Sequence, residues 1–202
     1  MTNDLQNKLN KLREVSEKKP KYVVNQTHRL FHRIFVFDLN SELDPDEIVQ
    51  LCKNYQKEEF REKETQSVYA WRSDYTHTNK NPMKGFEKLL SLVENKINST
   101  DNPYTYLIDH FWFAIYNKGD NSKLHNHRVV DLACVYYASV PLNSAPLIIP
   151  SDDGDLSITP KEGTLVIMPG YCNHMVPKSE HENGERIIVA MNAVKDRLVR
   201  KF

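Results

Sequence analysis

Three histidines are the residues of this chain whose type and spacing best suit chemistry. His125 and His127 are separated by one residue, and side chains on an extended segment alternate between its two faces. The pair is therefore expected to project from one face of a strand. His174 follows a later β-rich segment and can complete a set of three ligands on one metal ion. Three protein ligands leave coordination positions open, which suits a catalytic metal site better than a closed structural one.

A turn precedes each of the two histidine segments. Residues 119–121, Gly-Asp-Asn, lie upstream of His125, and Pro169 and Gly170 lie upstream of His174. Both turns are expected to place the imidazoles near strand ends, at the mouth of a small barrel where ligands bind. A single histidine is usually a satisfied core or surface residue, but the combination of spacing and turns favours a metal site.

Asp131 is an open alternative in the ligand set. Non-haem iron centres commonly use two histidines and one carboxylate. Asp131 is an even number of residues from His125 and His127, so on a continuous strand its side chain would project from the same face. A turn at residues 128–130 can interrupt this alternation. We favour His125, His127 and His174 as the ligands. Asp131 remains an alternative as a fourth or replacement ligand, or as an acceptor for an imidazole N–H.

Arg186 begins an otherwise apolar segment that runs to residue 192. A guanidinium does not face hydrocarbon without a partner. Arg186 is therefore expected to face water at the strand end, to pair with an acid such as Glu185, or to bind a carboxylate inside the barrel with two hydrogen bonds. Tyr116 can donate a hydrogen bond to the same carboxylate, and its alternative role is that of a packed core aromatic.

The elements that must position these residues form a helix-bearing front half and a β-rich back half. Helical spacing of apolar residues predicts helices over 1–20, from Asp44 to about residue 61, and from Pro82 to about residue 97. Strands are expected at 29–37 and 67–75. Further short strands are expected at 104–116, 131–140, 145–150, 155–158, 163–168 and 186–194. This series of short strands is typical of a sandwich or barrel.

The composition is compatible with one cytoplasmic domain. The 202 residues carry 27 basic and 27 acidic side chains, so nothing indicates attraction to nucleic acid or to an anionic membrane. The three cysteines are odd in number and lack paired spacing, which favours reduced thiols. No apolar run approaches the ~20 residues of a membrane span, and the N-terminus lacks a signal-like apolar core.

The pattern Tyr116-x-x-Gly119-x5-His125-x-His127, with His174 and Arg186 further on, resembles the iron(II)/2-oxoglutarate-dependent oxygenases. Within that superfamily the chain is similar to an oxygenase group of phages and bacteria related to the prolyl hydroxylases. The group has a His-x-His run followed by a strand ending Val-Tyr-Tyr, here residues 135–137. The front half agrees through Leu30-Phe31 and Ala70-Trp71-Arg72-Ser73, so the resemblance covers about residues 29–194.

The chain departs from that group at three places. Ala133-Cys134 stand where Ser-Gly is usual, and residues 168–170, Met-Pro-Gly, stand where Phe-Pro-Ser is frequent. His127 occupies a position that most of the superfamily gives to Asp or Glu. With Asp131 and the motif from Gly163 to His174, this histidine also makes the chain similar to the cupins.

The resemblance implies a mainly β fold with flanking helices, built on a double-stranded β-helix of jelly-roll or cupin-like type. Residues 1–28 would form an N-terminal helical extension and residues 29–202 the oxygenase domain. Within that domain, residues 29–103 would be a helix-rich support and residues 104–194 the barrel core.

The resemblance also implies that His125, His127 and His174 hold Fe(II), and that Arg186, with Tyr116, holds the distal carboxylate of the cosubstrate 2-oxoglutarate. With molecular oxygen, the enzyme would hydroxylate a small molecule, an amino acid or a peptide side chain, and it needs no catalytic side chain beyond the metal centre. We expect the substrate to lie against Trp71, Arg72, Tyr75 and residues 76–81, although Trp71 suits a core position equally well.

Two other functions remain open at this stage. A cupin-type dioxygenase or isomerase would need no 2-oxoglutarate, and His127 in place of a carboxylate favours it, whereas Arg186 opposes it. The second alternative is a non-catalytic jelly roll that binds a ligand. The sequence suggests no membrane or nucleic-acid partner, and it is compatible with a homodimer.

Overall fold

The computed structural model describes residues 21–27, 30–58, 67–78, 83–100, 104–152, 154–181 and 183–200, which form two antiparallel sheets and two helices. The larger sheet contains, in order, β1 (Lys21–Thr27), β2 (Leu30–Asp38), β11 (Thr164–Pro169), β8 (Leu132–Ser139), β13 (Arg186–Arg200), β6 (Tyr104–Tyr116) and β4 (Trp71–Arg72), with β5 (Thr76–His77) beside β6. The smaller sheet contains β10 (Leu156–Ile158), β9 (Leu147–Ile149), β12 (His174–Val176), β7 (Asn121–His125) and β3 (Val68–Tyr69). The helices are α2 (Pro45–Glu58) and α3 (Glu87–Asn98).

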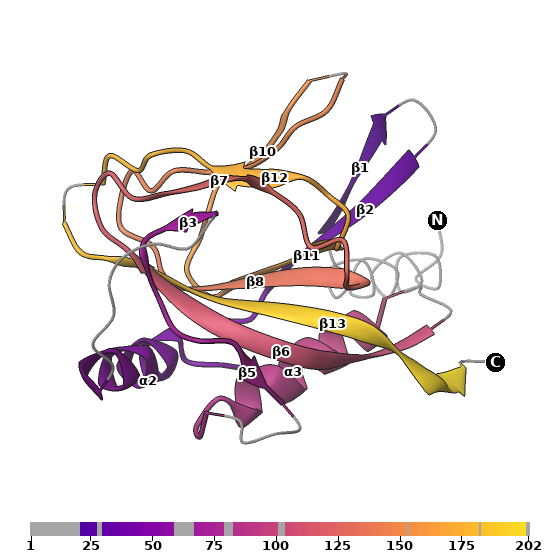
Figure 1. The fold of residues 1–202 in the computed structure, drawn as a ribbon, viewed down its shortest axis with the longest axis horizontal. Helices are drawn as coiled ribbons and strands as arrows, with labels where there is room; N and C mark the ends of the chain where they lie inside the picture. The colour runs from indigo at the N-terminus through magenta and orange to yellow at the C-terminus, as the bar shows by residue number, and fades with distance from the viewer. Residues whose placement is uncertain are drawn as a thin grey trace, which may run out of the picture.

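The larger sheet is covered on both faces. The two helices lie on one side of it and the smaller sheet on the other (Figure 1). Strand β6 shows why: Phe111 and Phe113 are buried in the core shared with the helices, whereas Trp112 and Tyr116 are buried in the core between the sheets. Because side chains alternate along a strand, one continuous apolar run serves both cores. This mainly β, jelly-roll-like arrangement agrees with the fold class expected from the sequence.

The two helices form largely where their apolar spacing predicts. Asp44 caps α2 by accepting a hydrogen bond from the Asp46 backbone N–H at 3.0 Å. Helix α3 buries Leu89, Leu90, Val93 and Ile97. It begins at Glu87 rather than at Pro82, which lies outside the described residues. Gly85 has a φ of 95°, a left-handed conformation that interrupts helical geometry just before the helix.

Several strands differ from the sequence-based prediction. The run expected at 67–75 divides into β3 and β4, which pair with β7 and β6 in different sheets. Strand β12 was not predicted, β7 ends at His125 instead of carrying both His125 and His127, and β13 continues to Arg200 instead of ending at residue 194. Of the expected N-terminal helical extension, residues 1–20 lie outside the described residues, and Lys21–Thr27 form a strand paired with β2.

Neither helix in the described part of the chain is long and apolar enough to cross a membrane. Cys52, Cys134 and Cys172 are all buried and form no disulfide, as their irregular spacing predicted.

Gly170 permits a close contact between two segments beside the histidines. Its backbone carbonyl accepts a hydrogen bond from the His127 N–H at 2.7 Å, and its own N–H donates to the Asp131 carbonyl at 2.9 Å. A Cβ atom at Gly170 would lie 2.2 Å from the Val130 carbonyl oxygen and 2.7 Å from that of His127. The segment after β11 thus holds residues 127–131 in place only if position 170 lacks a side chain.

We predict that Gly170→Ala lowers the free energy of unfolding by roughly 1–3 kcal/mol, because two stretches of backbone must separate to admit the methyl group. Urea denaturation of the metal-free protein measures this loss. Gly154→Ala is the control, since no atom lies within 4 Å of the added Cβ there and only its φ of 117° is unfavourable. Equal losses in the two variants would contradict the steric explanation.

Candidate metal centre

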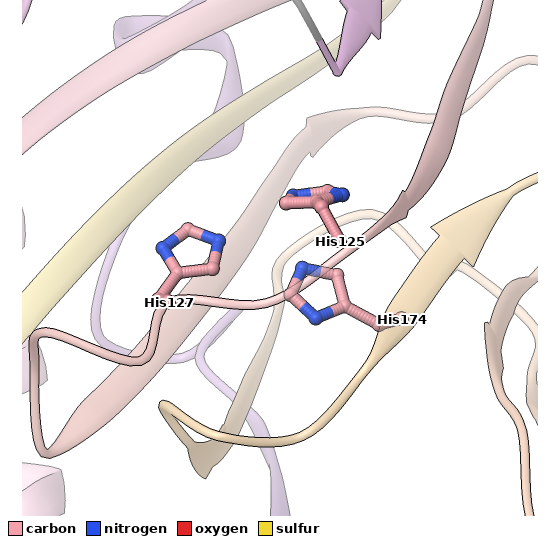
Figure 2. A group of neighbouring side chains, drawn as sticks. All are labelled: His125, His127 and His174. Atoms are coloured by element: carbon pink, nitrogen blue, oxygen red, sulfur yellow. The ribbon is translucent and has the colours of Figure 1, made fainter.

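The structure brings His125, His127 and His174 together at one end of the smaller sheet (Figure 2). His125 ends β7, His174 begins β12, and the two are directly opposite each other in the register of these strands. Donor atoms of the three imidazoles lie within 4.8 Å of one another. His127 lies two residues beyond β7, so it joins the group through a loop. The expectation that both histidines of the pair project from one strand was therefore wrong, although the grouping it predicted is present.

The hydrogen bonds of the three imidazoles leave the same nitrogen free on each ring. Nδ1 of His125 lies 2.7 Å from the Lys123 carbonyl oxygen, and Nδ1 of His174 lies 3.0 Å from that of Cys172. Nδ1 of His127 lies 2.7 Å from Oδ1 of Asn192. Each of these partners is an acceptor, so each Nδ1 carries the proton and each Nε2 keeps its lone pair. The three rings are thus in the tautomer that suits metal ligation through Nε2.

Burial keeps these imidazoles unprotonated. Loss of solvent lowers the pKa of His125, and it lowers the pKa of His127 to about 4 and that of His174 to about 3. The proximity of His125 contributes to the last two of these shifts. A metal ion that binds at neutral pH therefore displaces no proton from the group.

Asp131 is not part of the histidine group. Its Oδ2 accepts a hydrogen bond from the Lys195 backbone N–H at 2.9 Å, and its Oδ1 lies 3.3 Å from Lys195 Nζ. Asp131 is not the acceptor for an imidazole N–H of the group either, because the three Nδ1 atoms face the Lys123 carbonyl, the Asn192 side chain and the Cys172 carbonyl. The structure therefore supports the three-histidine set over the alternatives that include Asp131.

A chain of hydrogen bonds that sequence reasoning missed holds His127. The Asn192 side chain accepts from His127 through Oδ1, and its Nδ2 lies 2.8 Å from Nε2 of His110. His110 Nδ1 in turn lies 2.8 Å from a carboxylate oxygen of Asp109. Donors and acceptors alternate without conflict if each neutral imidazole is protonated on Nδ1. One signal in the sequence was available, because Asn192 is the only polar residue between positions 187 and 194.

A second group of donor atoms, from His77, Asp109 and His110, also lies within 4.8 Å. The hydrogen bond between Asp109 and His110 accounts for most of this proximity, and the side chain of His77 is 49% exposed. We interpret the group as the outer end of the hydrogen-bond chain to His127.

Arg186 lies in the cavity behind the histidines and is almost fully buried, with 1% of its surface exposed. Its guanidinium lies 5.5 Å from the ring centre of Tyr116 and 5.2 Å from that of Tyr137. One terminal nitrogen donates to the Ala145 carbonyl oxygen at 2.7 Å, but Nε has no hydrogen-bond partner. Glu185, the acid considered as its partner, pairs with Lys53.

The polar groups around Arg186 indicate an anion-binding site. The Tyr137 hydroxyl is buried without a well-formed hydrogen bond, and burial raises the pKa of Tyr137 despite the opposing effect of the Arg186 charge. Burial also raises the pKa of Tyr116, to about 12, so both phenols are neutral hydrogen-bond donors. A buried cation without a carboxylate is costly unless a ligand supplies the negative charge. The donor set therefore fits a small carboxylate.

An open groove of about 600 Å³ leads to the histidines from the outside. Trp112 forms part of its wall, with its ring stacked on that of His127 at 5.7 Å between centres. Arg72 and Tyr75, two of the residues expected to form the substrate wall, also line the groove. Trp71 instead packs in the core against Phe113, which is the alternative considered for it. Part of the expected 76–81 loop lies outside the described residues.

No protein-family model and no curated protein matches this chain. Solved structures do match. A viral collagen prolyl hydroxylase from Paramecium bursaria Chlorella virus-1, determined as a 2-oxoglutarate complex, has a TM-score of 0.61 and 16% identity, covering 79% of this chain and 94% of its own. A Trichoplax adhaerens prolyl hydroxylase, in complex with a peptide fragment of hypoxia inducible factor, has a TM-score of 0.61 and 17% identity, covering 81% and 84%.

A prolyl-4-hydroxylase from Pseudomonas putida has a TM-score of 0.57 and 16% identity, with coverage of 75% of this chain and 88% of its own. At these identities the likeness is one of fold. The chain thus has the fold of the 2-oxoglutarate and iron oxygenases represented by these prolyl hydroxylases.

We predict that His174→Ala and His125→Ala lose bound Fe(II), because the two remaining imidazoles compete poorly with water for the ion. Asp131→Ala should retain the ion, since that carboxylate is bound to Lys195. Iron content after anaerobic loading and gel filtration measures both outcomes. Full occupancy in His174→Ala would exclude that histidine as a ligand, and loss of iron from Asp131→Ala would place Asp131 among the ligands.

We also predict that Asn192→Ala weakens metal binding by roughly 10-fold or more, because the His127 N–H is left buried without an acceptor and the ring loses its orientation. Competition with a chromophoric chelator gives the dissociation constant for Co(II). Asn173→Ala is the matched control, since this exposed amide bonds to Asn126 and to no imidazole. Equal Co(II) affinity in the wild type and Asn192→Ala would show that the chain of hydrogen bonds has no influence on the centre.

Proposed function

We propose that the protein is a non-haem iron(II)- and 2-oxoglutarate-dependent oxygenase that hydroxylates an amino acid, a peptide side chain or another small molecule. One observation carries this proposal. Three neutral imidazoles with free Nε2 atoms converge at one end of a cavity, and a buried arginine that has no carboxylate partner among the described residues lies within the same cavity. A metal that binds a keto acid needs both features at once.

In this proposal His125, His127 and His174 hold Fe(II), and Arg186 pairs with the distal carboxylate of 2-oxoglutarate. When bound, the iron and the keto acid together activate molecular oxygen for a two-electron oxidation of substrate. The chain positions and shields these groups. Tyr116 and Tyr137 provide neutral hydrogen-bond donors beside Arg186, and the two-sheet core keeps bulk water from the cavity. We further propose that the sheets form a double-stranded β-helix, as the resemblance implies.

The cavity is narrow before a cosubstrate enters. Its volume is about 40 Å³, enough for a few water molecules but less than a five-carbon dicarboxylate requires. We expect binding to displace apolar side chains that line it, such as Leu147 and Val176 from the smaller sheet. That sheet is built from short strands and can yield more readily than the larger one, where β13 and β6 pair over most of their length.

The comparisons support this proposal at the level of fold. One of the similar structures is a prolyl hydroxylase determined with 2-oxoglutarate, and another is a prolyl hydroxylase with a peptide bound. A substrate presented as a peptide or amino acid side chain is therefore included in the proposal, with molecular oxygen as the second substrate.

A cupin-type metal enzyme that does not use 2-oxoglutarate is the second candidate. The three-histidine set favours it, since His127 stands where a carboxylate is usual. The unpaired Arg186 opposes it, because such an enzyme has no use for a buried cation behind the metal. The two candidates differ in whether 2-oxoglutarate binds.

We predict that Arg186→Ala raises the dissociation constant of 2-oxoglutarate by 30-fold or more while Fe(II) stays bound. The expectation follows from the roughly 2–5 kcal/mol lost when one partner of a buried charge pair is removed. Arg186→Lys should restore only part of the affinity, because an ammonium cannot form the two parallel hydrogen bonds that a guanidinium makes with a carboxylate. Calorimetry on the iron-loaded protein without oxygen measures binding and needs no knowledge of the substrate.

Lys161→Ala is the control, since this cation is exposed and bonded to Asp38. Succinate release from 2-oxoglutarate, iron and oxygen provides a second readout. No binding of 2-oxoglutarate by the wild type would favour the cupin-type candidate, whereas undiminished binding by Arg186→Ala would contradict the role of Arg186 in holding the cosubstrate.

A further inference from the structure

Arg72 projects into the groove next to the histidines. It belongs to β4 and pairs with Ala114 of β6, so its side chain lies on the face of the larger sheet that carries Trp112 and Tyr116. That face is the one that borders the cavity. Arg72 is therefore a second cation near the candidate metal centre, placed in the outer groove, whereas Arg186 lies in the inner cavity.

Within the part of the chain that the structure describes, the guanidinium of Arg72 has aromatic neighbours and no carboxylate that forms an ion pair with it. It lies 4.3 Å from the ring centre of Tyr75 and 5.9 Å from that of Trp112. Its Nε is buried without a hydrogen-bond partner. Stacking of this kind holds the group in one orientation and removes part of its hydration, which strengthens a later pairing with an anion.

The rest of the groove offers little charge and much apolar surface. Among its lining residues in the described part of the chain, Arg72 is the only lysine, arginine, aspartate or glutamate. Leu124 and Val129, both at the groove, are 54% and 93% exposed. A ligand that fits this surface has an apolar part for Trp112 and the exposed side chains, and one anionic group for Arg72.

We propose that the groove selects a substrate that carries a carboxylate, that Arg72 binds this carboxylate, and that an adjacent apolar part lies against Trp112. This inference rests on the proposed oxygenase function and names its substrate class. A free carboxylic acid and an acidic side chain of a peptide share this chemistry. Arg72 thus determines specificity and takes no part in holding the metal or the cosubstrate.

The test uses iron-loaded protein with 2-oxoglutarate in the absence of oxygen, so that no turnover occurs. Two matched pairs of probes are titrated by calorimetry: 3-phenylpropionate against 3-phenylpropionamide, and acetyl-Phe-Glu-amide against acetyl-Phe-Gln-amide. We expect at least one acid to bind roughly 10-fold tighter than its neutral counterpart. The pair with the larger difference identifies a free acid or a peptide as the source of the carboxylate.

Arg72→Gln should abolish the preference for the acid and leave the affinity of the neutral probes unchanged. Arg72→Lys should retain part of the preference. Arg128→Gln is the control, since Arg128 is an exposed arginine of the loop after His127 that does not line the groove. It should keep the full preference.

Two outcomes would overturn the proposal. The first is equal binding of acids and neutral probes by the wild type, including no binding of either. The second is a weakened affinity for 2-oxoglutarate in Arg72→Gln, which would assign Arg72 to the cosubstrate. Failure of the oxygenase function itself is distinguished by Arg186→Ala, whose 2-oxoglutarate affinity is measured separately and does not involve the probes.

Discussion

The register between β7 and β12 is the constraint on which the candidate centre depends. It sets His174 opposite His125, so two of the three imidazoles meet only if these short strands pair in this alignment. A shift by one residue would turn one imidazole to the other face of the sheet. The strands are short, and neighbouring contacts hold the alignment. Gly170 hydrogen-bonds the loop that carries His127, and β9 flanks β12 on its other side.

The larger sheet supplies the rigid side of the site. Its long central strands bury apolar side chains on both faces, against the helices and against the smaller sheet. Arg186, Asn192 and His110 are among the polar side chains that the site takes from it, and they interrupt otherwise apolar surfaces. An unpaired polar group in such a core is costly. Asn192 and His110 have hydrogen-bond partners, and Arg186 is placed where it could bind an anion.

Features governed by local pattern were predictable from the sequence. The strand at residues 104–116, the apolar stripe of α3 and the start of α2 at Asp44 all depend on neighbours within a few residues. The grouping of His125, His127 and His174 was also predicted, although the route of His127 through a loop was not. Features governed by pairing of distant segments were missed. Asn192 meets His110 across 82 positions, and Asp131 is held by Lys195 across 64. Nothing local to Asp131 indicates that Lys195 will engage it, and no short-range pattern separates β3 from β4.

Strand β13 carries both Arg186 and Asn192 on the face toward the cavity, six positions apart. An extended strand rises about 3.3 Å per residue and cannot stretch. It therefore fixes the separation between the buried guanidinium of Arg186 and Asn192, the residue that orients His127. Under the proposed function, a ligand that reaches from the metal toward Arg186 would lie along this rigid face of the larger sheet. Under the proposed function, changes in the loops around the groove can therefore alter the substrate, while the strand keeps Arg186 and the residue that orients His127 in the same relative positions.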